Sequence, residues 1–350
     1  MSEFRTSREE DPLVKSWEWQ LANSHVNLES LSKVIKFTED ERENLLELTF
    51  LPMRITPYYA EVIKNSSALR KTVIPSIFET IKHEKESSDP LKEEESSICK
   101  DLVHKYPDRV LFLVTNFCSN YCRYCTRSRY IEKNISDWDK PLVYIREHTE
   151  IRDVLLSGGD PLTMKDDKIE YLLSELRKIP HVEIIRIGTK VPMVMPQRIT
   201  DDLVNMIKKY HPVYMSVHCT HPDEITPEVK EACNKIANAG IVMRSQTVLL
   251  KDVNDSSEVM KNLMQKLLSV RISPYYLYSC DRIEGSNHFF VDPRKGIEII
   301  KDLRGWTSGY AIPQFIIDSE LGKIPVNPDY CEFKDDKTII KNYKEESVEF

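Results

Sequence analysis

Three cysteines close together are the feature of this sequence that points most directly to chemistry. Cys118, Cys122 and Cys125 form a Cys-x3-Cys-x2-Cys run directly after the apolar stretch 109–114. Three thiolates at this spacing can bind three irons of a four-iron four-sulfur (4Fe-4S) cluster, whereas tetrahedral zinc would need a fourth protein ligand. The simpler alternatives are buried apolar cysteines or half a zinc site. The preceding apolar stretch and a later glycine pair, Gly158-Gly159, favour the cluster.

The cysteine spacing resembles that of the radical S-adenosylmethionine (SAM) enzymes. In these enzymes the fourth iron has no protein ligand and binds the amino and carboxylate groups of SAM. The cluster then reduces the sulfonium of SAM, which yields a 5′-deoxyadenosyl radical. We therefore expect Cys118, Cys122 and Cys125 to be the metal ligands of this chain. A reductant such as flavodoxin or ferredoxin is expected as a partner.

Composition and charge are those of an ordinary globular enzyme. The chain has 350 residues, 41% of them apolar, and a net charge of −7 with both signs interspersed. A nucleic-acid partner is therefore unlikely on charge grounds, because binding to phosphates calls for a basic surface. The polar start and the absence of a long apolar run predict neither a signal peptide nor a membrane span, so a cytoplasmic protein is expected. The five other cysteines are scattered, which favours a reducing compartment.

The pattern along the chain predicts three regions. Residues 1–100 have helical spacing of apolar residues, with a capping box at Thr38-Glu39-Asp40-Glu41, and the Glu-, Lys- and Ser-rich stretch 82–100 is interpreted as a solvated connection. Residues 101–318 alternate short apolar runs with amphipathic segments, which indicates an α/β fold of repeated βα units, a parallel barrel or part-barrel. Residues 319–350 form a C-terminal segment with a short tail. The expected strands are 110–114, 154–156, 183–187, 213–217, 241–250, 272–278 and 314–317.

Polar residues follow these expected strands. In a parallel barrel the loops after the strands share one face, where catalytic side chains gather. The sequence therefore predicts one site at that face. The residues concerned are Cys118, Gly158-Gly159-Asp160, Lys190, His218, Asp281 and Asp318.

Ten short segments in the same order resemble the lysine 2,3-aminomutase family, radical SAM enzymes that also use pyridoxal phosphate (PLP). The resemblance covers about residues 12–345 and implies a radical SAM partial (β/α)6-type TIM barrel with an N-terminal helical region. The segments are 17–21, 55–59, 106–110, 118–127, 155–162, 196–200, 221–226, 246–250, 274–278 and 303–310.

The resemblance implies residues for two cofactors. For SAM they are the turn Ser157, Gly158, Gly159 and Asp160, together with His218 and Gln246, although polar core roles for the last two fit equally well. For PLP, Lys323 matches the lysine to which the family attaches this cofactor, and Tyr106 and Arg109 match positions that hold its phosphate. Two departures stand out. Ser319-Glu320-Leu321-Gly322 replaces the usual run of glycines before the lysine, and Lys105 stands where relatives have arginine.

Three further residues correspond to the family's substrate contacts. Arg127 resembles the arginine that pairs with the α-carboxylate, and Asp281 and Asp318 resemble two aspartates that bind the distal ammonium of lysine. Either aspartate alone could be a loop cap or a turn residue. Two carboxylates that converge in a pocket with little water favour a cation between them, so the pair selects a basic side chain.

The resulting prediction is an isomerase that moves the 2-amino group of L-lysine to carbon 3 to give β-lysine. Arginine and ornithine are alternative substrates, since each presents a cation to the aspartate pair. A non-catalytic iron-sulfur regulatory protein is the alternative from another class. Longer relatives end in a cysteine-rich tail that binds zinc between subunits, whereas this sequence stops at Phe350 and has Ser256 where they place a partner cysteine. Any homo-oligomer is therefore expected to lack structural zinc.

Overall fold

A curved sheet of mostly parallel strands organises the chain. The computed structural model describes residues 11–46, 51–131, 137–334 and 337–349. Ten strands follow one another in chain order across the sheet, and the seven from β3 to β9 are parallel. The parallel strands are β3 (Arg109–Thr115), β4 (Asp153–Gly158), β5 (Ile184–Thr189), β6 (Val213–His218), β7 (Val242–Leu249), β8 (Ser273–Ser279) and β9 (Gln314–Ser319). Each of the seven apolar runs of the sequence forms one of them, which confirms the predicted strands.

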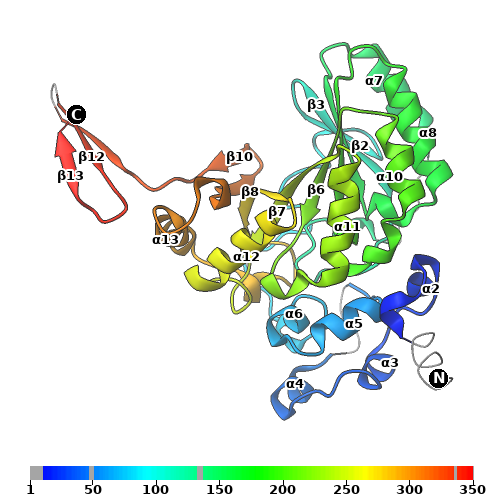
Figure 1. Cartoon of the computed structure of the whole chain (residues 1–350), viewed down its shortest axis with the longest axis horizontal. Coiled ribbons are helices and arrows are strands. Elements are labelled where there is room, and N and C mark those ends of the chain that lie inside the picture. Colours follow the sequence, from blue (N-terminus) through cyan, green and yellow to red (C-terminus); the bar gives the residue numbers. More distant parts are fainter. Residues whose placement is uncertain (1–10, 47–50, 132–136, 335–336, 350) are drawn as a thin grey trace.

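Helices connect successive parallel strands and cover the convex face of the sheet (Figure 1). Their apolar stripes pack on the sheet; in α8, for example, Ile169, Leu172, Leu173 and Leu176 are buried. Six such units followed by a seventh parallel strand agree with the expected (β/α)6-type partial barrel. The helices of these units are α7 (Asp139–Glu147), α8 (Asp166–Arg177), α9 (Val191–Val194), α10 (Asp201–Lys208), α11 (Pro227–Asn238), α12 (Ser257–Ser269) and α13 (Pro293–Leu303).

Side chains bring the two edges of the sheet together. One edge ends in the antiparallel strands β1 (Ser97–Cys99) and β2 (Leu102–Tyr106), and the other ends in β10 (Gly322–Pro325), which is antiparallel to β9. The Tyr106 hydroxyl accepts a hydrogen bond from the backbone N–H of Lys323 at 2.9 Å. Lys105 Nζ, from the same edge, donates to the carbonyl of Ser319 at 2.7 Å. The sheet is therefore closed by these contacts instead of by a strand ladder.

Short helices of the N-terminal region pack beneath the barrel (Figure 1). Thr38 and Glu41 form the predicted capping box at the start of α4. Ile55, Tyr58 and Ile63 are fully buried and belong to the same core as the sheet residues. The region therefore continues the barrel core. Its helices are α2 (Trp17–Ala22), α3 (Leu28–Ser32), α4 (Glu39–Asn44), α5 (Pro57–Ile63) and α6 (Ser67–Lys71).

The interpretation of residues 82–100 as a solvated connection is wrong for two side chains in its second half. Leu91 and Glu93 are 7% and 5% exposed, and β1 begins at Ser97. Glu93 is buried because two arginines of the cysteine loop surround its carboxylate. Composition alone suggested a solvated segment, since a charge buried by pairing looks the same in sequence as a charge in water.

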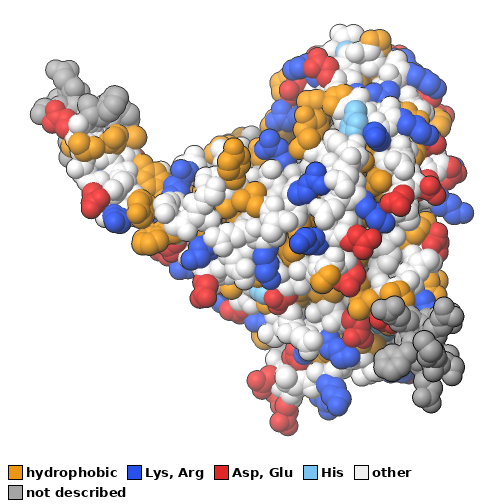
Figure 2. Space-filling view, viewed as in Figure 1, with side chains coloured by type: hydrophobic (Ala, Val, Ile, Leu, Met, Phe, Trp, Pro, Cys, Tyr) orange, Lys and Arg blue, Asp and Glu red, His pale blue; other side chains and the backbone are white. Residues whose placement is uncertain are grey.

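The C-terminal segment forms a second, small sheet that projects from the barrel (Figure 1). Its antiparallel strands are β11 (Cys331–Lys334), β12 (Lys337–Lys341) and β13 (Ser347–Glu349). Charges of both signs are interspersed on the face of the molecule shown in Figure 2. Within the described residues, no helix combines the length and the apolar character that a membrane span requires.

Candidate active site

The cysteine run lies on the loop after β3, against the loop after β4. The N–H of Gly159 donates to the Thr115 carbonyl at 2.5 Å, and the N–H of Asp160 donates to the Phe117 carbonyl at 2.8 Å. These bonds join the two loops at the end of the sheet where the first two parallel strands finish.

The glycine pair is required by this contact between backbones. Gly158 has φ +115°, and a Cβ there would lie 2.2 Å from the Thr115 carbonyl oxygen. A Cβ at Gly159 would lie 2.3 Å from the carbonyl oxygen of Phe117. The resemblance implied a SAM contact for these glycines; the structure shows that the backbone of the cysteine loop approaches them closely.

Asp160 is occupied by protein donors. Its Oδ1 accepts from the N–H of Leu162 and from Thr189 Oγ1, at 3.1 and 2.7 Å. Its Oδ2 accepts from the N–H groups of Lys190 and Val191, at 2.7 and 3.1 Å. Four donors fill the acceptor positions of one carboxylate. In this arrangement Asp160 ties the loops after β4 and β5 together, and its binding to SAM stays a prediction.

A buried arginine fixes the cysteine loop from the other side. Arg123, between the second and third cysteines, is fully buried and forms an ion pair with Glu79, whose side chain is 1% exposed. Its Nη1 donates to the carbonyls of Leu51 and Pro52 at 2.9 and 3.0 Å. The backbone N–H of Arg123 donates to the Thr72 carbonyl at 2.8 Å. The N-terminal region thus sets the path of the loop. Sequence reasoning missed this role, although an arginine inside the cysteine run was a visible signal.

Burial keeps the three cysteines protonated unless a metal ion binds them. Burial raises the pKa of Cys125 to about 11, and it raises those of Cys118 and Cys122 as well. The other two cysteines raise the pKa of Cys118 further, so the three thiols lie within range of one another's charge. Within the described residues, no three His, Cys, Asp or Glu side chains already stand at metal-binding distances. A cation at this position would replace the three protons and stabilise the thiolates.

Asn120, inside the same loop, has a side-chain amide that a ligand beside the cysteines could bind. Both its amide nitrogen and its amide oxygen are buried and have no hydrogen-bond partner. Buried polar groups are rarely left in this state, because the loss of water is not repaid. A polar group bound beside the cysteines would satisfy them. The residues present therefore fit an iron-sulfur cluster with a polar ligand.

A second buried ion pair lies beneath the cysteines. Lys190 Nζ and Glu224 Oε1 are 2.6 Å apart, and their side chains are 9% and 0% exposed. Glu224 also accepts from the Tyr59 hydroxyl at 2.8 Å and from the N–H of Thr220 at 2.6 Å. The Lys190 ammonium opposes the effect of burial on the pKa of Cys122, so its positive charge acts on that thiol. Glu224 and Tyr59 are further site residues that sequence reasoning did not single out.

The two side chains predicted to contact SAM from later strands lie beside each other. His218 at the end of β6 pairs in register with Gln246 of β7. Burial, together with the charges of Lys190 and Arg127, lowers the pKa of His218 to about 4. His218 is therefore neutral at physiological pH and can accept or donate one hydrogen bond. Gln246 Nε2 donates to the Tyr278 hydroxyl at 3.5 Å, which is a long hydrogen bond.

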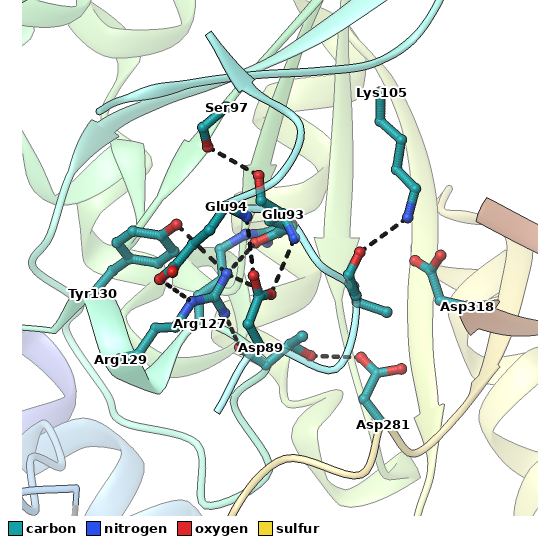
Figure 3. Close-up of polar contacts among 12 residues, drawn as sticks. Asp89, Glu93, Glu94, Ser97, Lys105, Arg127, Arg129, Tyr130, Asp281 and Asp318 are labelled. Carbon is teal, nitrogen blue, oxygen red and sulfur yellow. Dashed lines mark hydrogen bonds and ion pairs between the residues drawn. The ribbon is translucent and has the colours of Figure 1, made fainter. Parts of the chain in front are cut away.

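The predicted substrate residues converge on the same face (Figure 3). Arg127 Nη2 donates to Glu93 Oε1 at 2.6 Å. The Asp281 carboxylate accepts from Thr126 Oγ1 at 2.6 Å, and Asp318 Oδ2 lies 2.6 Å from Lys323 Nζ. The structure thus brings residues of β9, of β10 and of the loops after β3 and β8 into one site.

Electrostatics show that these groups act on one another. Burial, together with the charge of Asp318, raises the pKa of Asp281 to about 6. The Thr126 hydrogen bond and the charges of Lys323 and Arg127 partly oppose this rise. The two aspartates therefore repel each other across a space with little water, and a cation between them would relieve the repulsion.

The residues matched to PLP lie where the sheet edges meet. The Arg109 guanidinium stacks 3.8 Å over the Tyr106 ring, and Arg109 Nη1 is 2.7 Å from Asp108. The Arg109 side chain is 38% exposed, so its remaining donors can reach a phosphate. Lys105, in contrast, donates to the carbonyls of Leu91 and Ser319. These residues fit a phosphate-bearing cofactor beside Lys323, with Arg109 as its cation.

We predict that Cys118→Ala, Cys122→Ala and Cys125→Ala each prevent cluster assembly, because the cluster needs all three thiolates of this loop. Protein reconstituted with iron and sulfide without oxygen should bind about four irons per chain in the wild type. Iron and sulfide analysis measures the effect, and Cys331→Ala, at an exposed position, is the matched control. Full iron content in any of the first three variants would contradict the assignment.

We predict that Asp281→Asn stabilises the cofactor-free protein at pH 8. The pKa of Asp281 is raised from 3.8 to about 6 on folding, so the free energy of unfolding falls as the pH rises from about 4 to about 6 and stays lower above that. Two pKa units correspond to about 2–3 kcal/mol, which the neutral amide recovers. Urea unfolding at pH 4, 6 and 8 measures this, with the exposed Asp202→Asn as control. A stability difference that does not shrink toward pH 4 would be inconsistent with this cause.

Comparisons with known proteins agree with this site. Residues 112–264 match the Radical SAM superfamily, and residues 300–348 match the family described as Lysine-2,3-aminomutase. The chain is 46% identical to the L-lysine 2,3-aminomutase of Clostridium subterminale over 340 residues, which is 94% of this chain and 82% of that protein. It is 47% identical to the Bacillus subtilis protein of the same name, covering 94% and 72%.

A relative with a different named substrate is almost as similar. The glutamate 2,3-aminomutase of Clostridioides difficile is 43% identical over 326 residues, covering 90% of this chain and 77% of that protein. The matches run across the cysteine loop, the parallel sheet and the segment around Lys323. Membership implies a 4Fe-4S cluster, SAM and PLP as cofactors. The chain belongs to the lysine 2,3-aminomutase family, isomerases of the radical SAM superfamily.

Proposed function

We propose that this protein moves the 2-amino group of L-lysine to carbon 3 and yields β-lysine, with PLP attached at Lys323. One observation carries the choice of lysine. Asp318 already binds a primary ammonium, that of Lys323, at 2.6 Å, and Asp281 lies within its electrostatic range. A pocket of this kind accepts the distal ammonium of lysine without rearranging its charges.

An acidic substrate suits this pocket poorly. The distal carboxylate of glutamate would bring a third negative charge to Asp281 and Asp318, whose mutual repulsion already raises the pKa of Asp281. Like charges in a site with little water cost several kcal/mol unless a cation accompanies them. This argument favours lysine over the substrate named for the glutamate relative. Ornithine and arginine also carry a distal cation and are therefore included in the test.

The proposed cofactor residues of the site serve the cluster, SAM or PLP. Cys118, Cys122 and Cys125 hold the cluster, and Ser157, Gly158 and Gly159 line the adjacent turn toward SAM. His218 and Gln246 contribute hydrogen bonds to SAM from the ends of β6 and β7. Tyr106 and Arg109 hold the phosphate of PLP. The residues for the cluster and SAM lie at or near the C-terminal ends of parallel strands, whereas Tyr106 and Arg109 lie at the turn between β2 and β3.

The substrate is held at both ends. Arg127 binds its α-carboxylate, and Asp281 and Asp318 bind its distal ammonium. When bound, the cluster and SAM supply the radical that removes a hydrogen atom, and PLP supports the migrating nitrogen. The residues of this chain fix the carbon skeleton between two charged ends and exclude water from the buried face. Such positioning keeps a reactive radical beside one carbon of the substrate.

Two further parts of the proposal concern partners. The cluster needs a one-electron donor, for which a flavodoxin or a ferredoxin is suited. An assembly of identical subunits would form without structural zinc, because Ser256 provides no thiol at the corresponding position.

The product assay is the direct test. Reconstituted protein with PLP, SAM and dithionite should convert L-lysine to β-lysine, detected by chromatography, and should act on ornithine, arginine or glutamate less efficiently. Asp281→Asn and Asp318→Asn should each weaken lysine binding by about 2–5 kcal/mol, because each removes one charge from a buried ion cluster. Lysine affinity close to that of the wild type in both variants would show that these aspartates do not select the substrate.

Attachment of PLP at Lys323 has its own test. Reduction with borohydride should fix PLP to the protein, and peptide mapping should find it on the peptide that contains Lys323. Lys190 is the fallback candidate, but its side chain is 9% exposed against 34% for Lys323, so a cofactor reaches Lys323 more easily. Lys323→Ala should lose the absorbance of bound PLP and keep its iron. A label on Lys190 would overturn the assignment.

A further inference from the structure

Residues 86–94 form a strap across the face of the sheet that carries the site. At its start, the N–H of Ser87 donates to the Arg282 carbonyl at 2.9 Å, and Glu86 Oε1 accepts from the N–H of Asn287 at 2.9 Å. Both contacts are with the loop that follows β8 and begins with Asp281. The strap is therefore attached to one of the two aspartate-bearing segments.

The middle of the strap reaches the other aspartate-bearing segment. The Leu91 carbonyl accepts from Lys105 Nζ, and the same ammonium donates to the Ser319 carbonyl, directly after Asp318. Lys92 Nζ lies 2.8 Å from Glu320 in the turn before Lys323. The strap thus contacts both segments that are proposed to bind the distal ammonium of the substrate.

Glu93 lies between these attachments and faces the cysteine loop (Figure 3). Its side chain is 6% exposed, and its oxygens lie 2.6 Å from Arg127 Nη2 and 3.2 Å from Arg129 Nη2. Burial favours a raised pKa for Glu93, but the charges and hydrogen bonds of the two arginines outweigh it and the pKa is lowered. Glu93 is therefore ionised, and it is held by two cations.

The two arginines depend on Glu93 to different degrees. Arg129 also pairs with Asp89 at 2.7 Å and with Glu94 at 3.4 Å. For Arg127, Glu93 is the carboxylate at ion-pair distance among the described residues. Arg127 uses Nη2 for this contact, and its side chain is 26% exposed. A guanidinium has further donors in the same plane, so Arg127 has an unused donor edge.

We propose that Glu93 is a positioning residue, which orients Arg127 so that this free edge binds the α-carboxylate of the substrate. The inference rests on the proposed function, in which Arg127 takes that carboxylate. Without Glu93, the Arg127 guanidinium lacks its fixed acceptor and can rotate away from the substrate. The strap thereby links the two ends of the substrate site: it holds Arg127 through Glu93, and it contacts the two segments that bear the aspartates.

Binding of two ligands to PLP-loaded protein that is kept oxidised tests this inference, because no turnover occurs in that state. The ligands are L-lysine and its carboxyl amide, lysinamide, which lacks the carboxylate charge, and calorimetry gives both dissociation constants. The wild type should bind lysine more tightly. In Glu93→Ala the ratio of the lysinamide dissociation constant to the lysine dissociation constant should fall about tenfold. This change corresponds to one oriented charge-assisted hydrogen bond. Affinity for lysinamide should change little.

Two variants separate orientation from other roles. Glu93→Gln keeps the length and an acceptor oxygen, so it should restore most of the preference although the charge is gone. Glu94→Ala is the matched control, because the Glu94 side chain is 64% exposed and pairs with Arg129 and not with Arg127. If Glu93→Ala does not fold, Glu93→Asp takes its place: it keeps the charge, cannot reach Arg127 in the same way, and should lose part of the preference.

Three results would overturn the inference. One is a Glu93→Ala variant, or the Glu93→Asp variant used in its place, that prefers lysine over lysinamide as strongly as the wild type does. A second is tighter lysine binding in Glu93→Ala, which would mean that Glu93 competes with the substrate. A third is an equal loss in Glu94→Ala. A wild type that binds lysine as expected but makes no β-lysine contradicts only the proposed function. A wild type without any preference for lysine over lysinamide contradicts the assignment of Arg127 itself.

Discussion

The fully buried ion pair of Arg123 and Glu79 fixes the loop on which the proposed chemistry depends. A charge removed from water is tolerated only when its partners are in place, so this pair has essentially one acceptable geometry. Arg123 is also bound to carbonyls of the N-terminal region, and it lies between two of the three cysteines. The N-terminal helices therefore do more than enlarge the core, since they set where the cysteines can stand.

Three further cations in the site, of which Lys190 is buried and the other two are partly exposed, also have carboxylate partners. Lys190 has Glu224, Arg127 has Glu93, and Lys323 has Asp318. Asp281 differs, since among the described residues its contact is the Thr126 hydroxyl and no cation lies at ion-pair distance. Burial without a cation at ion-pair distance raises the pKa of Asp281. The ammonium of the proposed substrate would supply a cation at this position.

Several loops meet at the site, and each is attached to its neighbours by polar contacts. Gly159 and Asp160 bind the backbone of the cysteine loop, and Asp160 binds the loop after β5. Tyr106 and Lys105 connect the two edges of the sheet beside Lys323. A partial barrel lacks the complete strand ladder that holds a closed barrel in shape. Here these contacts supply that restraint at the end of the barrel where the proposed chemistry takes place.

The sequence by itself determined the strands and the residues that share the face of the site. Seven apolar runs became seven parallel strands, because alternation of buried strands and amphipathic helices has few other solutions. Cys118, Asp281 and Asp318 were found from their places after those strands, with the resemblance to the family giving their roles. Local spacing is sufficient for such features.

Only the tertiary structure decided which charges are buried and what they contact. Glu93 lies in a Glu- and Lys-rich stretch that reads as solvated, and it is buried because Arg127 and Arg129, far from it in sequence, surround it. Arg123, Glu79 and Glu224 are similar cases. The conformational freedom of Gly158 and Gly159 was visible, but the backbone they approach was not. The physical reason is common to all of them: a charge or a missing side chain has its energy set by partners distant in the chain, and composition does not record distance.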